Sequence, residues 1–188
     1  MPFGSQCVHK PLPLILIALC LLTVGACRPK PIEYRPMATV KDIMDSLVEP
    51  AADALWGSVT TIVTSSGIEE RAPHTDKEWA NARRQAIEVI EATNLLIMPG
   101  RHIAGFGEKN ENSKVELAPE QIEMLVNSDP KAWTVLAHGL YDAGLDVLRA
   151  IDAKNANALS DAGAKLDTAC ENCHGRYWYP VQPKNERH

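Results

Sequence analysis

One stretch of the chain, from Pro130 to Ile151, has small or apolar residues at strictly alternating steps of four and three. These residues are Trp133, Ala137, Leu140, Gly144, Val147 and Ile151. Such spacing forms one apolar seam on a helix and is typical of helices that pack nearly parallel to one another. Asp129 and Pro130 suit the N-cap and the first helical position. The stretch therefore predicts a long helix packed lengthwise against others.

A first helix is predicted to begin at Thr39. Asp42 stands three residues later, as in a capping box, and apolar residues then recur at helical spacing. Pro50 falls inside this pattern and has no N–H group, so a kink or a break is expected there. We interpret the run VTTIVT at 59–64 as the end of this helix.

A second helix is marked by the full capping box Thr75-x-x-Glu78 and is ended by Pro99-Gly100. Residues 99–129 then form a long polar connection, with a short helix expected at 119–126. This connection leads into the helix that follows Asp129.

The last helix is predicted to follow Asn155, a turn residue and N-cap. Four amphipathic helices over about 140 residues predict an all-α fold, an antiparallel up-down-up-down four-helix bundle, over residues 39–180. Residues 181–188 form a polar tail. The alternative is a bundle with a dry core and no cofactor.

Residues 1–26 have the layout of a signal peptide. Lys10 precedes an apolar run from Leu14 to Val24, which is shorter than the roughly 20 residues that span a bilayer. The sequence Val24-Gly25-Ala26-Cys27 resembles the lipobox of bacterial lipoproteins. This resemblance implies that Cys27 is lipidated and that the protein is tethered to a membrane, facing the periplasm.

The segment 27–38 contains several prolines and is expected to be an extended tether. Two alternatives stay open for the N-terminus. Cleavage near Ala26 would leave a soluble periplasmic protein, and an uncleaved apolar run would leave a retained anchor.

The most specific motif is Cys170-Glu171-Asn172-Cys173-His174, near the end of the last predicted helix. Cys170 and Cys173 lie one helical turn apart, so each thiol can bond one vinyl group of the same haem. His174 then becomes an axial ligand of the iron, which is the C-x-x-C-H pattern of c-type haem attachment. With Cys27 lipidated, this pair holds the remaining cysteines of the mature chain.

The cysteine pair has three other interpretations. A structural zinc site needs four ligands, and no second Cys or His pair is present after cleavage. A reactive dithiol needs a thiolate at a helix N-terminus, whereas this pair lies toward a C-terminus. A structural disulfide remains open, because the periplasm is oxidising.

The helix number, the helix lengths and Cys170-x-x-Cys173-His174 at the end of the last helix resemble the class II c-type cytochromes. This family comprises cytochrome c-prime and its low-spin relatives, and the resemblance covers about Thr39 to Pro180. It implies one covalent haem c at the end of the last helix, with His174 as the proximal ligand. The connection 99–129 is longer than the compact family pattern.

In the low-spin members a Met of the first helix is the sixth ligand, and Met44 matches that position. Met44 as simple core packing is the alternative. Other side chains expected near the same end of the bundle are Met98, His102, Met124 and His138.

The expected function is electron transfer with redox partner proteins, through a low-spin haem with His/Met ligation. No enzymatic activity is expected. If Met44 packs away from the iron, the alternative is a five-coordinate protein that binds NO or CO. The formal net charge of −5 argues against nucleic acid as a partner. A homodimer stays open, since the family often forms dimers.

Overall fold

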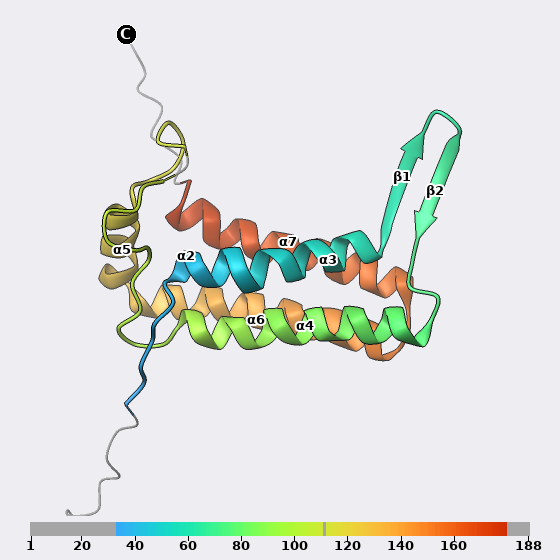
Figure 1. Ribbon diagram of the computed structural model, residues 1–188, viewed down its shortest axis with the longest axis horizontal. Coiled ribbons are helices and arrows are strands. Elements are labelled where there is room, and N and C mark those ends of the chain that lie inside the picture. The colour runs from blue at the N-terminus through green and yellow to red at the C-terminus, as the bar shows by residue number, and fades with distance from the viewer. Residues whose placement is uncertain (1–32, 111, 180–188) are drawn as a thin grey trace, which may run out of the picture. The chain divides into compact units, whose positions relative to one another are not determined.

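The computed structural model describes residues 33–110 and 112–179 (Figure 1). The unit that begins at Tyr34 contains all of the helices and strands named here. The predicted signal peptide, the lipidation site Cys27 and the polar tail 181–188 lie outside the described residues. Within the described part, no helix is both long enough and apolar enough to cross a membrane.

The described chain is mainly helical, which confirms the predicted fold class in its coarse form. The connection after the second predicted helix contains the expected short helix, which extends to Ser128. The helical elements are α2 (Val40–Ile43), η1 (Met44–Val48), α3 (Glu49–Ser58), α4 (Asp76–Leu96), α5 (Pro119–Ser128), α6 (Pro130–Asp152) and α7 (Ala156–Tyr177).

The predicted N-caps are confirmed. At the start of α2, the Thr39 hydroxyl accepts from the Asp42 N–H at 3.1 Å, and the Asp42 carboxylate accepts from the Thr39 N–H at 2.8 Å. At the start of α4, Thr75 and Glu78 form the same reciprocal pair. A side-chain oxygen of Asp129 caps α6, and one of Asn155 caps α7.

The chain remains helical through Pro50. The π-helical segment η1, Met44–Val48, ends two residues before it, and the Glu49 N–H donates to the Met44 carbonyl. Since Pro50 has no N–H to donate to the Ser46 carbonyl, a wider turn accommodates it without a break. The first helix therefore continues as α2, η1 and α3.

The interpretation of residues 59–64 as a helix end is wrong. They contain the whole of β1 (Thr60–Thr64), which pairs antiparallel with β2 (Gly67–Arg71). The run is rich in β-branched residues, and Gly67 adopts a φ of 138° that suits the turn. The hairpin projects from the far end of α3 (Figure 1).

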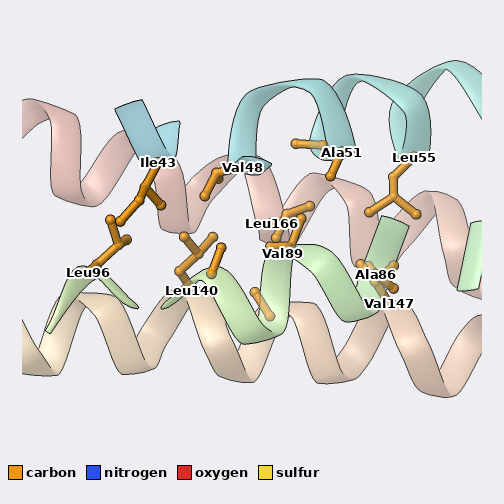
Figure 2. Close-up of a cluster of buried hydrophobic side chains, with 14 of the residues drawn as sticks. Ile43, Val48, Ala51, Leu55, Ala86, Val89, Leu96, Leu140, Val147 and Leu166 are labelled. Carbon is orange, nitrogen blue, oxygen red and sulfur yellow. The ribbon is translucent and has the colours of Figure 1, made fainter. Parts of the chain in front are cut away.

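The core forms where α6 packs against α4 and α7, and α3 packs against α4 and α7. Figure 2 shows side chains from all of these helices and from η1 meeting between them. Val89, Val147 and Leu166 are completely buried there. Between α3 and α7, the Trp56 indole N–H donates to the Gly163 carbonyl at 3.1 Å.

A close approach of α4 and α6 at Gly144 gives a stability prediction. A Cβ atom at this position would lie 2.8 Å from Cγ1 of the buried Ile90. Gly144→Ala should therefore lower the free energy of unfolding by about 1–3 kcal/mol, as overpacking does. Chemical denaturation of the two proteins measures this difference.

The matched control is Gly139→Ala, on an exposed face of the same helix. A Cβ there has no neighbour within 4 Å. This variant should gain about 0.5–1 kcal/mol from helix propensity. Equal stabilisation by both substitutions would contradict the close packing of α4 and α6.

Candidate functional site

The segment between α4 and α5, called the connection from here on, closes one end of the fold. The first free N–H groups of α2, those of Val40 and Lys41, donate to the carbonyls of His102 and Ile103, both at 2.9 Å. A helix N-terminus has no carbonyls of its own for these groups, so the connection satisfies them. Ile103 is buried at this contact.

Further bonds bring other helix ends to the same place. The Leu117 N–H donates to the Trp178 carbonyl just after α7, at 3.0 Å. The indole N–H of Trp133, in the first turn of α6, donates to the Leu96 carbonyl at the end of α4, at 3.0 Å. The start of α2, the end of α4, the start of α6 and the end of α7 therefore meet here.

An apolar cavity of about 30 Å³ lies at this end and brings the predicted site residues together. Its lining includes Cys170, Cys173, His174 and Met44. The other lining side chains are Val40, Leu96, Trp133, Leu136, Ala137, Leu140, Ala169 and Trp178.

A larger cleft of about 420 Å³ lies beside the cavity. Met44, Cys170, His174 and Trp178 line both spaces, so these side chains form the wall between them. The far side of the cleft is built by the connection and α5. Residues from that side include Ile103, Lys109, Asn110, Leu117 and Ile122.

The cleft carries more acidic than basic side chains. Lys41 and Lys109 are the lysines in its lining, and Lys41 pairs with Asp45 at 2.5 Å. The acidic side chains of the lining are Asp45, Glu49, Asp53, Glu116, Asp167 and Glu171.

The surroundings of the two cysteines keep their thiols protonated. Burial, together with the Asp167 and Glu171 carboxylates, raises the pKa of Cys170 to about 11. Burial raises the pKa of Cys173 to about 12, and the neighbouring Cys170 contributes. A redox-active dithiol needs a lowered pKa, so this environment does not suit one.

The environment of His174 favours the neutral ring that a metal ligand requires. Burial lowers its pKa, although the carboxylates of Glu171 and Glu49 act in the opposite direction. The ring lies against Trp178, with centroids 5.9 Å apart, and meets Tyr179 edge-on at 6.1 Å. These aromatic neighbours restrict where the imidazole can turn.

The other candidates do not line the apolar cavity. His102 is exposed and its Nδ1 lies 2.9 Å from a Glu123 carboxylate oxygen. Met124 is 65% exposed on α5, and His138 is exposed on α6. Met98 lies 3.3 Å from the Arg101 guanidinium.

Arg101 has a structural role that the sequence did not indicate. Its guanidinium donates to the Leu95 carbonyl at 2.7 Å and to the Ala38 carbonyl. It thereby joins the end of α4 to the segment before α2. Burial lowers the pKa of this side chain.

The donor set fits a covalent haem in chemical type. The residues that line this mostly apolar space carry two thiols, one imidazole with a lowered pKa and one thioether, and these are the groups that c-type haem uses. The cavity alone has room for one or two water molecules. A porphyrin would need the volume of the adjoining cleft as well.

Comparison with known proteins finds no matching family model and no significantly similar curated protein or solved structure. Among the described residues, no three His, Cys, Asp or Glu side chains gather as they would around a bare metal ion.

Trp178 is the site residue whose place was least evident from the sequence. In the sequence, Tyr177, Trp178 and Tyr179 indicate only apolar packing over the last helical turn, which Pro180 ends. Trp178 lines both spaces and its carbonyl holds Leu117, so it joins α7 to the segment between α4 and α5. Its position one helical turn after His174 was the feature of the sequence that could have indicated a place in the site.

Proposed function

We propose that this protein is a monohaem c-type cytochrome that transfers electrons on the periplasmic side of a membrane. Its helices would form an up-down-up-down four-helix bundle, with the haem at the end of α7. Cys170 and Cys173 would hold the haem by thioether bonds, with His174 and Met44 as axial ligands. Cys27 would carry the lipid anchor.

One observation carries this proposal: Met44, Cys170, Cys173 and His174 line the same apolar cavity. They come from two elements that are distant in the sequence, η1 and α7. A chance pair of cysteines would have no reason to share a cavity with both an imidazole and a thioether.

The protein would supply binding, orientation and a dry environment. The apolar side chains around the cavity, among them Leu96, Trp133 and Leu140, would exclude water. Trp178 and Tyr179 would fix the ring of His174, and the thioether of Met44 would favour the reduced state. A bound haem supplies an iron that accepts and releases one electron.

The optical spectrum of the purified full chain, produced in a host that matures c-type cytochromes, tests this proposal. We expect a red protein with a low-spin spectrum in both redox states, and no reaction of the reduced form with carbon monoxide. A colourless protein with two free thiols would refute the cytochrome. Ready binding of carbon monoxide would favour the five-coordinate alternative, with Met44 as a packing residue.

A further inference from the structure

Exposed apolar side chains are concentrated at the end of the fold that contains the candidate site. Phe106 is fully exposed in the connection, and Met37, just before α2, is 91% exposed. The other large exposed apolar side chains of the connection, α5 and the chain ends nearby are Tyr34, Val115, Met124, Leu125 and Tyr179.

The rest of the described surface has few comparable side chains. Val63 and Ile68 project from the hairpin at the opposite end of the helices, and Ile87 lies on α4 (Figure 1). Val135 lies in the second turn of α6. The large exposed apolar side chains are therefore distributed unevenly along the long axis of the helices.

Phe106 stands between two glycines, and Gly107 has a φ of 76°. The loop thus presents its aromatic ring away from the protein, although burying such a ring would be favourable. A concentration of exposed apolar side chains such as the one at this end marks a surface that contacts a protein or a membrane.

The position of the N-terminal segment indicates which apolar phase that is. The chain enters α2 at this same end, because the N–H groups of Val40 and Lys41 bond to the connection. Cys27 lies seven residues before Tyr34, a distance of at most about 25 Å when extended. A lipid on Cys27 would therefore hold Tyr34, Met37 and the adjoining connection within reach of the bilayer surface.

The charges at this end do not select an anionic partner. The exposed Lys109 and Lys114 of the connection alternate with Glu108 and the half-buried Glu116. Apolar burial is then the main attraction. Tethering raises the effective concentration of membrane, so a few weakly binding side chains suffice.

We propose that this end of the fold, with Phe106 and Met37 as its principal contacts, docks on the lipid surface to which the N-terminus is anchored. The inference rests on the lipid anchor of the proposed function. In this orientation the hairpin lies at the end of the helices that is remote from the membrane (Figure 1).

Photocrosslinking to lipid tests the docking. The photoreactive residue p-benzoylphenylalanine replaces Phe106 in the full lipidated chain, reconstituted in phosphatidylcholine vesicles with radiolabelled lipid. Val63 is the matched control, because it is 79% exposed on the hairpin. Position 106 should take up at least about tenfold more labelled lipid than position 63, a ratio that burial of one aromatic side chain supports. Position 37 should behave like position 106.

The outcomes separate the docking from the cytochrome. Equal or absent lipid labelling at 106, with the chain floating on the vesicles, would overturn the docking and leave the anchor intact. A chain that does not float with the vesicles would overturn both the docking and the lipid anchor. Crosslinking of 106 to a second copy would also overturn the proposal, because a protein would then occupy this surface. Haem staining of the same gel reports on the cytochrome independently.

Discussion

Replacing both Cys170 and Cys173 with serine should abolish covalent haem attachment. Each serine keeps the approximate size of the side chain but cannot form a thioether bond. After denaturing electrophoresis, the wild-type band should stain for haem and the variant band should not. A variant in which only one of the two cysteines is replaced should retain at most one thioether bond to the haem.

The control is Asn172→Ala, between the two cysteines. Asn172 is exposed on α7, so this change alters the surface and leaves the motif intact. We expect a normal haem stain and a change in unfolding free energy within about 0.5 kcal/mol. Haem staining that persists in the double serine variant would show that the proposed attachment chemistry is wrong.

Replacing Met44 with alanine should convert the protein from a low-spin form to one that binds carbon monoxide. Met44 lines the cavity, so its thioether would be lost from the set of residues that would hold the haem iron, and carbon monoxide could then bind. Loss of a Met/His ligand pair should also lower the reduction potential. The removed side chain, which is half-buried, should cost about 1–3 kcal/mol of stability. Optical spectroscopy, redox titration and chemical denaturation measure these three effects.

Met124→Ala provides the comparison, since Met124 is 65% exposed on α5 and does not line the cavity. Its spectrum and potential should equal those of the wild type. A Met44→Ala variant that keeps the low-spin spectrum would assign the sixth ligand to another side chain. The cytochrome itself would still stand in that case.

The helix starts were predictable because capping is local. Each N-cap side chain accepts a hydrogen bond from the backbone N–H three residues later, and such short-range pairs can be recognised in the sequence. The N-cap residues are Thr39, Thr75, Asp129 and Asn155. The hairpin was not predictable from helical periodicity, because VTTIVT directly follows a helical pattern and extends it. The turn that follows, ending at Gly67, was the signal for a hairpin.

The site was predictable to the extent that it follows from helix register. Cys170, Cys173 and His174 lie within about one turn, and Met44 lies on the inner face of the first helix. The far side of the cleft, built by the connection and α5, depends instead on long-range contacts. Nothing local in the sequence indicates that Val40 bonds to His102, or that Leu117 bonds to Trp178.

The hairpin has a consequence for how this protein behaves at high concentration. The strand β1 has the uncharged sequence TTIVT, and among the described residues only β2 pairs with it. The outward backbone edge of β1 therefore has no charged side chain to discourage a new strand, whereas β2 carries Glu69, Glu70 and Arg71. Fibril growth, where it occurs, should begin by strand addition at β1.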